Sequence, residues 1–435
     1  MEQWRLEPKS NRPMRFLATF ICLLVVCSAQ AQGPAKVEIK QQNDQWTLLK
    51  NGEPYYVNGA GGHVRMDVVV ECGGNTIRTW GLDNAKQILD EAHSHGLMVM
   101  LGLWMAHERH GFDYSDEWAV EDQVIGFTQA VKELKDHPAL LLWGVGNEVD
   151  LFYSDLNVWT ATERIAAMIH EVDPNHPTCA VTAGIDVAEI QLIQSMAPSV
   201  DILGINTYGG IDGLSTQIDL YGWTKPYLVT EWGPTGHWEV AKTSWGAPIE
   251  ESSTEKATAY HNRYLQGIAA DKEQCMGSFV FHWGQKQETT PTWYGVFLES
   301  GEKTQAIDVL HTVWSGKEPS TKAPEISVYK INGSTKEDGP KLAGGQKVKV
   351  ELEYSDADND VTAVDWELLP ESTDIKAGGD VEERPDAIAG AVTYSMTSGA
   401  ATLDVPAVSG PYRLFVYVRD KDGKVATSNI PFWVD

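Results

Sequence analysis

Short apolar runs alternate with helical patterns through most of the chain. Each run has the length and apolar content of a buried β-strand. The eight runs are Tyr55–Asn58, Thr76–Trp80, Met98–Trp104, Leu140–Gly146, Thr178–Thr182, Ile202–Asn206, Tyr227–Thr230 and Gly277–Trp283. A short hairpin is predicted just before them, with its turn at Asn51-Gly52.

Amphipathic helices are predicted between the runs. Val120, Val124 and Phe127 recur at spacings of four and three, after Asp116 as the expected N-cap. Another helix is predicted to begin with the capping-box pattern Ser252-x-x-Glu255. Helical patterns therefore separate successive strands, which is typical of parallel α/β architecture.

Eight strands alternating with helices over about 260 residues match the number and length of a (β/α)8, or TIM, barrel. The rival α/β architecture is an open doubly wound sheet, which would normally carry a Gly-rich nucleotide loop after an early strand. Neither GxGxxG nor GxxxxGK occurs in the sequence. The pattern thus favours the barrel.

The pattern changes after Trp314. Residues 315–324 are rich in Gly, Pro, Ser and Lys. Apolar positions then recur at every second residue over 347–354, between Lys and Glu, and over 412–419, where Phe415 and Tyr417 are among the intervening residues. About 110 residues of such strands predict an immunoglobulin-like β-sandwich. The expected organisation is a signal peptide (1–31), the barrel with its hairpin (32–316), a linker (317–324) and the sandwich (325–435).

The N-terminal residues have the pattern of an export signal. Arg12 and Arg15 precede an apolar run over 16–26, and Ala29-Gln30-Ala31 supplies an A-x-A cleavage pattern. Lipidation at Cys27 stays open as an alternative. No later run reaches the roughly 20 apolar residues of a membrane span. We therefore expect an exported bacterial protein, in the periplasm, on the cell surface or outside the cell, with no membrane span.

Net charge and composition restrict the class of ligand that the protein is expected to bind. Lys and Arg number 34 against 61 Asp and Glu, a formal net charge of −27. A strongly acidic protein repels nucleic acid, which needs a basic footprint. The balance fits a neutral ligand, and the 16 Trp supply flat apolar surfaces for one.

Two carboxylates are predicted where a TIM barrel builds its active site, at the C-terminal ends of strands. Glu148 follows the fourth run in Gly146-Asn147-Glu148, and Glu231 follows the seventh in Thr230-Glu231-Trp232. Hydrolysis of a glycosidic bond needs one protonated and one ionised carboxyl group. The sequence predicts that these two residues form such a pair.

Three more residues are expected beside the pair. Arg78, at the end of the second run, is expected to place positive charge near Glu231, or else to form a plain salt bridge in the barrel. Tyr208 is expected to donate a hydrogen bond to the same carboxylate, or to be a rim aromatic. Asn147 is expected to hold a sugar hydroxyl.

This ordered set resembles glycoside hydrolase clan A. The resemblance covers roughly residues 45–315 and rests on Gly146-Asn147-Glu148, Thr230-Glu231-Trp232-Gly233, Asn206-x-Tyr208, Arg78 and Trp283. It implies that Glu148 is the acid/base, that Glu231 is the nucleophile and that the anomeric configuration is retained.

Two features of the sequence bear on the family within the clan. The Asn-x-Tyr motif is similar to that of family 2 barrels, but family 2 enzymes carry two β-domains before the barrel. An N-terminal barrel with one trailing sandwich is closer in layout to the bacterial family 158 endo-β-1,3-glucanases.

Aromatic residues at strand ends are candidates for stacking against sugar rings. Trp104, Trp232 and Trp283 are the ones we expect in subsites, and several together favour a polysaccharide over a small glycoside. We expect no cofactor and no metal, since His107-Glu108-Arg109-His110 lacks the HExxH spacing of a zinc site. Calcium at the acidic turns around Asp358 and Asp422 is the alternative.

The leading hypothesis is a secreted retaining hydrolase of β-linked polysaccharide, an endo-β-1,3-glucanase acting on neutral β-glucan. The same two carboxylates would also serve a β-mannanase, a β-galactosidase or a β-1,3-glucanosyltransferase. A carbohydrate-binding protein without catalysis is the rival from another class, and the presence of both carboxylates argues against it.

Overall fold

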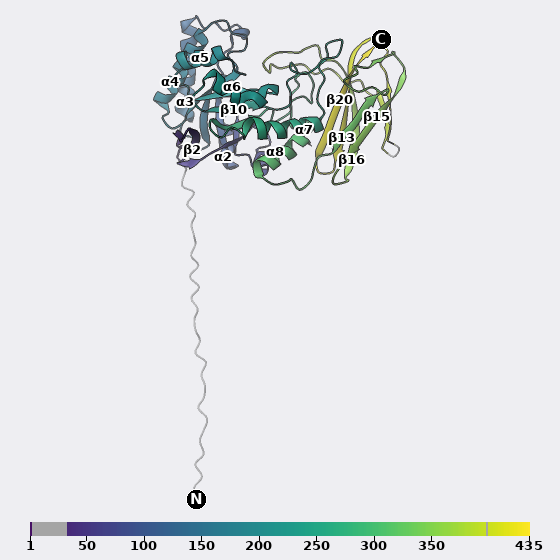
Figure 1. The fold of residues 1–435 in the computed structure, drawn as a ribbon, viewed down its shortest axis with the longest axis horizontal. Helices are drawn as coiled ribbons and strands as arrows, with labels where there is room; N and C mark the ends of the chain where they lie inside the picture. The colour runs from purple at the N-terminus through teal and green to yellow at the C-terminus, as the bar shows by residue number, and fades with distance from the viewer. Residues whose placement is uncertain (2–32, 397–398) are drawn as a thin grey trace. The chain divides into compact units, whose positions relative to one another are not determined.

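The computed structural model describes Met1, residues 33–396 and residues 399–435. The predicted signal peptide lies, apart from Met1, outside the described residues. Residues 33–435 form one compact unit that contains the whole of the barrel and the C-terminal sheets (Figure 1).

A three-stranded antiparallel sheet precedes the barrel. Its strands are β1 (Val37–Gln42), β2 (Gln45–Lys50) and β3 (Glu53–Pro54). The predicted turn is present, because Asn51 and Gly52 both have positive φ, 54° and 87°, as a tight hairpin turn requires. Val37 and Leu48 belong to the same apolar cluster as Val57 and Met98 of the barrel, so this sheet packs against the barrel interior.

The predicted (β/α)8 barrel is confirmed. Its strands are β4 (Val57–Gly61), β5 (Thr76–Arg78), β6 (Met98–Leu103), β7 (Leu140–Val145), β8 (Thr178–Ala183), β9 (Ile202–Asn206), β10 (Tyr227–Trp232) and β11 (Cys275–Val280). They pair in parallel and in chain order, and β11 closes on β4. Every strand overlaps the run that predicted it.

Helices surround the barrel strands. They are α1 (Met66–Glu71), α2 (Ala85–Ser94), α3 (Glu117–Leu134), α4 (Asn157–Val172), α5 (Val187–Met196), α6 (Leu214–Tyr221), α7 (Ser253–Asn262) and α8 (Gln305–Ser315), with short helical turns η1 (Glu108–His110), η2 (Gly209–Gly213) and η3 (Arg263–Ile268). None of the helices in the described ranges is long and apolar enough to cross a bilayer.

Both expected N-caps are formed. Asp116 accepts hydrogen bonds from the amides of Trp118 and Ala119, and Ser252 and Glu255 make the reciprocal bonds of a capping box. These contacts satisfy amide groups that the first turn of a helix leaves unpaired. They therefore fix where α3 and α7 begin.

Two sheets of mainly antiparallel strands form the C-terminal part, as predicted. One orders β12 (Lys303–Thr304), β20 (Lys424–Val434), β19 (Gly410–Asp420) and β16 (Val361–Pro370), with β14 (Lys341–Leu342) also on β20. The other orders β13 (Glu325–Ile331), β15 (Lys347–Ser355), β18 (Ala400–Asp404) and β17 (Val392–Ser395). Among the described residues of these sheets, only the short strands β12 and β14 pair in parallel, both with β20. Residues of both sheets, such as Leu403 and Leu414, share one core.

The sandwich and the barrel are joined by more than the linker. Strand β12, which precedes α8, pairs in parallel with β20 of the sandwich. Buried Glu250 accepts hydrogen bonds from Lys256 at 2.6 Å, within the barrel, and from Asn429 at 2.6 Å, in the sandwich. Such a paired, buried contact favours a fixed arrangement of barrel and sandwich.

Candidate active site

Glu148 stands at the C-terminal end of β7, where the chain makes a tight turn. Gly146 has φ 71°, and a Cβ there would meet Val149 at 3.0 Å, so the turn suits glycine. Glu148 itself has φ 51°, and its amide donates to the carbonyl of Val181 at 2.9 Å. A left-handed conformation in a residue other than glycine often marks a functional position. Here it places Glu148 in the wall of a cavity.

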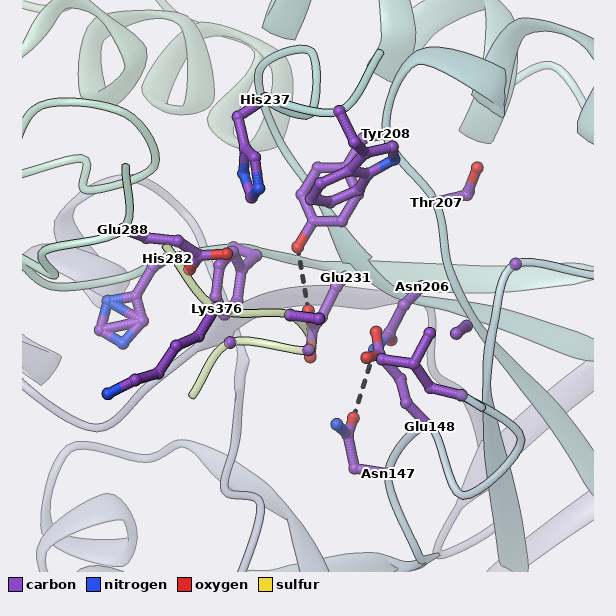
Figure 2. A pocket seen from close by; sticks show the side chains of 18 of the residues that line it. Asn147, Glu148, Asn206, Thr207, Tyr208, Glu231, His237, His282, Glu288 and Lys376 are labelled. Carbon is purple, nitrogen blue, oxygen red and sulfur yellow. Dashed lines mark hydrogen bonds between the residues drawn. The ribbon is translucent and has the colours of Figure 1, made fainter. Parts of the chain in front are cut away.

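Glu231 lies in β10 and is 5% exposed. Its Oε1 accepts hydrogen bonds from Arg78 Nη1 at 3.1 Å and from Trp80 Nε1 at 2.8 Å. Its Oε2 accepts one from the Tyr208 hydroxyl at 2.9 Å (Figure 2). Three donors, one of them cationic, compensate the negative charge of a buried carboxylate and fix its orientation.

Arg78 is the hub of a wider network. It is almost fully buried, and its guanidinium also donates to the carbonyl of Thr230 at 2.6 Å and to Asn147 Oδ1 at 2.6 Å. The Asn206 amide donates to Glu148 Oε1 at 2.8 Å and to Asn147 Oδ1 at 3.2 Å. Side chains from β5, from the turn after β7, and from β9 and β10 thus form one hydrogen-bonded network, and Asn147 is part of it.

The carboxyl group of Glu148 holds its proton more tightly than an ordinary glutamate. Burial and the negative charge of Glu231 raise its pKa from 4.5 to about 7, against the opposing effect of the Asn206 hydrogen bond. Two carboxyl groups in different environments can divide the roles of acid and nucleophile. Glu148 has the environment of a proton donor, and Glu231 has the donor set of an ionised carboxylate.

The two carboxyl groups open into a cavity of about 660 Å³. Its walls include Trp80 and Trp104, both partly exposed, and the charged side chains of Glu239, Lys286 and Glu288. Residues 376–379 of the C-terminal half of the chain form a further part of the wall. The volume is in the range of small-molecule binding sites.

Of the three tryptophans predicted to form subsites, one lines the cavity and two do not. Trp104 is 40% exposed and lines the cavity. Trp232 and Trp283 are completely buried outside the lining, and the expectation that they contact substrate is not supported by their positions. Successive strand residues point to opposite faces. Trp232, next to Glu231, therefore points toward the helices and packs on Tyr260.

Trp283 packs in the same helical layer, stacked on Trp314 of α8 with ring centroids 6.0 Å apart. Sequence reasoning missed the tryptophan that does contact a predicted catalytic side chain, Trp80. The sequence spacing could have predicted this contact. Trp80 follows Arg78 by two residues at a strand end, and side chains two residues apart in an extended strand share a face.

Residues in the loop after β11 were also missed. Glu288 and Lys286 lie in the cavity wall, with Lys286 Nζ 2.8 Å from Glu288 Oε2. This loop has no periodicity that would place it over the site. The contribution of 376–379 was missed for the same reason, because this segment of the predicted sandwich carries no periodic pattern that would place it at the barrel.

No group of three or more His, Cys, Asp or Glu side chains in the described part of the chain is arranged to hold a metal ion. His107, in the motif considered for zinc, is buried, and one of its ring nitrogens lies 2.6 Å from the Asn147 carbonyl. It supports the turn that carries Glu148.

Comparisons with known proteins point to one group of enzymes. The chain is 24% identical over 311 residues to a β-glucuronidase of Paenibacillus borealis, covering 61% of this chain and 50% of that protein. It is 22% identical over 224 residues to the β-glucuronidase of Felis catus, covering 47% and 29%. No family model matches the chain.

Solved structures agree on the fold. A Bacteroides uniformis β-glucuronidase 2, covalently bound to cyclophellitol-6-carboxylate aziridine, matches 92% of this chain and 48% of its own with TM-score 0.52 and 13% identity. A β-glucuronidase of an uncultured Clostridium sp. covers 65% and 54% with TM-score 0.50 and 17% identity. The chain spans half or less of the length of the Paenibacillus borealis and Felis catus β-glucuronidases. The barrel is thus like those of family 2 glycoside hydrolases, with β-glucuronidase relatives at low identity.

Proposed function

We propose that the protein is a retaining glycoside hydrolase with Glu231 as nucleophile and Glu148 as acid/base. The observation that carries the proposal is that the two carboxyl groups have different environments. Glu231 accepts three hydrogen bonds, and the pKa of Glu148 is raised to about 7. Both face the same cavity, as double displacement requires.

In the first step Glu148 gives its proton to the glycosidic oxygen while a Glu231 oxygen attacks the anomeric carbon. The bond from that carbon to the leaving oxygen breaks, and a glycosyl ester with Glu231 forms. In the second step Glu148 takes a proton from water, the water oxygen attacks the same carbon and Glu231 leaves. Two inversions retain the configuration, and Glu148 ends protonated again.

We propose β-1,3-glucan, cleaved internally, as the substrate. The acidic chain suits a neutral glycan. The layout of a barrel followed by a sandwich resembles family 158, and Trp104 and Trp238 stand exposed at the cavity. Export across a membrane, consistent with the N-terminal pattern, would bring the enzyme to such a polymer. A β-glucuronidase is the second candidate, favoured by the names of the relatives.

The experiment compares the protein with its Glu231→Gln variant on laminarin, mixed-linkage glucan, mannan, galactan and p-nitrophenyl β-glucuronide. Release of oligosaccharides from laminarin by the parent alone is the expected result. Exclusive release from the glucuronide would replace our substrate and keep the mechanism.

A 2-deoxy-2-fluoro glycoside with a good leaving group should label one residue, which peptide mass spectrometry would identify as Glu231. A label elsewhere would refute the assigned nucleophile. A folded parent that cleaves none of the glycans and takes no label would contradict the proposal as a whole. Thermal unfolding of both proteins confirms that the variant is folded.

A further inference from the structure

We propose that Glu288 binds hydroxyl groups of an uncharged sugar ring, and that it excludes uronic acids from that position. The inference rests on the proposed glycosidase function and deepens it by naming the class of sugar held on the nucleophile's side of the cavity. It concerns a residue in the loop after β11 that no motif in the sequence singled out.

Glu288 is a buried carboxylate with unused hydrogen-bonding capacity. It is 5% exposed and lines the cavity. Lys286 Nζ lies 2.8 Å from its Oε2, and within the described ranges no other group donates to the carboxylate. An ionised carboxylate offers about four acceptor sites. Burying them unused is costly, so partners from the cavity are expected.

The position of Glu288 identifies the part of the substrate that meets it. In Figure 2, Glu288 and His282 lie on one side of Glu231, and Glu148 with Asn147 lies on the other. The leaving group must sit at Glu148, since that residue protonates its oxygen. The sugar that becomes bonded to Glu231 therefore extends toward Glu288 and presents its hydroxyl groups there.

Both lysines of the wall already form an ion pair within the protein. Lys286 is paired with Glu288, donates to the Gly379 carbonyl at 2.7 Å and lies 5.5 Å from the Phe281 ring centroid. Lys376 lies 3.2 Å from Asp374 and donates to the carbonyl of Val381. Each ammonium group already has anionic and carbonyl partners.

The two histidines of the wall do not supply positive charge either. Burial lowers the pKa of His282 to about 3 and that of His237 to about 4. A uronic acid in this part of the cavity would bring its carboxylate among Glu231, Glu239 and Glu288 with no uncommitted cation. Like charges at short range discriminate against a ligand more sharply than missing contacts do. A neutral hexose faces no such penalty.

The test compares the parent, Glu288→Gln and the exposed control Glu299→Gln on p-nitrophenyl β-glucoside, β-galactoside, β-mannoside and β-glucuronide. We expect the parent to prefer a neutral glycoside over the glucuronide by at least about 100-fold in kcat/KM. Glu288→Gln should lower kcat/KM for the neutral glycoside by about tenfold or more and reduce this preference. Glu299→Gln should leave both unchanged.

A parent that prefers the glucuronide, or a Glu288→Gln variant with an unchanged preference, would overturn the inference. The proposed function would survive either result if all hydrolysis still required Glu231. A folded parent that hydrolyses neither these glycosides nor laminarin would remove the proposed function and this inference together. Labelling of Glu231 by a 2-deoxy-2-fluoro glycoside in Glu288→Gln shows that loss of turnover does not come from misfolding.

Discussion

Glu382, between β16 and β17 of the sandwich, accepts a 2.6 Å hydrogen bond from the backbone amide of Thr289, in the loop after β11 of the barrel. Its other carboxylate oxygen accepts one from the amide of Lys376 at 2.9 Å. Glu382 is 5% exposed. One buried side chain therefore holds together two segments of the cavity wall that are far apart in sequence.

Removing this side chain should loosen the wall. In Glu382→Ala the amide of Thr289 loses its partner, at a cost of about 1–3 kcal/mol for an unsatisfied buried donor. We expect KM for the substrate to rise severalfold, with a smaller change in kcat, because Glu148 and Glu231 lie on other elements. Steady-state kinetics and urea unfolding would measure both effects. The neighbouring exposed Glu383→Ala is the matched control, and equal kinetics in both variants would contradict this role.

The raised pKa of Glu148 predicts a pH dependence. The general acid must be protonated, so kcat/KM should fall as the pH rises through about 7. In Glu148→Gln this alkaline limb should disappear, and turnover of substrates with poor leaving groups should fall by about 10²–10⁴-fold. Turnover of activated aryl glycosides should fall less. A limb that persists in the variant would assign the titration to another group.

The same group affects stability in a defined direction. Between pH 4.5 and about pH 7, the ordinary and the raised pKa of this carboxyl group, the folded protein holds a proton at Glu148 that the unfolded chain releases. The free energy of unfolding from this group therefore decreases as the pH rises through that range. Thermal unfolding at pH 5 and pH 8 should show that the stability of Glu148→Gln relative to the parent is greater at pH 8 than at pH 5. A constant difference would refute the assignment.

The barrel could be predicted from sequence because its strands are buried on both faces and read as apolar runs between capped helices. Glu148 and Glu231 could be placed because each follows such a run directly, at the end where a barrel builds its site. Arg78 and Tyr208 were placed by the same rule. These positions depend on local sequence and on the topology alone.

The outer wall could not be predicted, for a physical reason. Arg109 contacts Asp380 at 2.8 Å across 271 positions of the chain, and loops that meet at such separations carry no periodic pattern. Gly378 and Gly379, with φ 63° and 70°, adopt a backbone conformation that favours glycine, and a Cβ at these positions would stand 2.7 Å from Arg109 Nη2 and 2.8 Å from Lys286 Nζ. Strand alternation, by contrast, would have placed Trp232 in the helical layer next to Glu231, whereas the sequence prediction put it in a subsite.

Substitution of Tyr208 tests how much its hydrogen bond to Glu231 contributes to catalysis. Its hydroxyl is one of the three donors to Glu231, and Tyr208→Phe removes it without changing the ring that packs 5.6 Å from Tyr294. A hydrogen bond to a charged group contributes about 1.5–3 kcal/mol, so kcat/KM should fall by about 10–100-fold. Tyr354→Phe, in the sandwich, is the control. Unchanged kinetics in Tyr208→Phe would show that Arg78 and Trp80 are sufficient.

Trp104 tests whether the cavity binds a chain of sugars. It is the one predicted subsite tryptophan that reaches the cavity, where it packs at 4.7 Å from the ring of His107. Stacking of a sugar on the indole face should contribute about 0.5–1.5 kcal/mol. Trp104→Ala should therefore raise KM for oligosaccharides by about 2–10-fold and leave that for aryl monosaccharides unchanged.

The matched control is Trp118→Ala, a tryptophan that is 85% exposed and lies outside the cavity lining. Kinetics on a ladder of laminari-oligosaccharides would locate the effect, because KM should change only from the length at which a sugar reaches Trp104. An effect of equal size on monosaccharide and oligosaccharide substrates would place the indole beside the reacting sugar. No effect at any length would mean that the aromatic wall on this side serves packing against His107 alone.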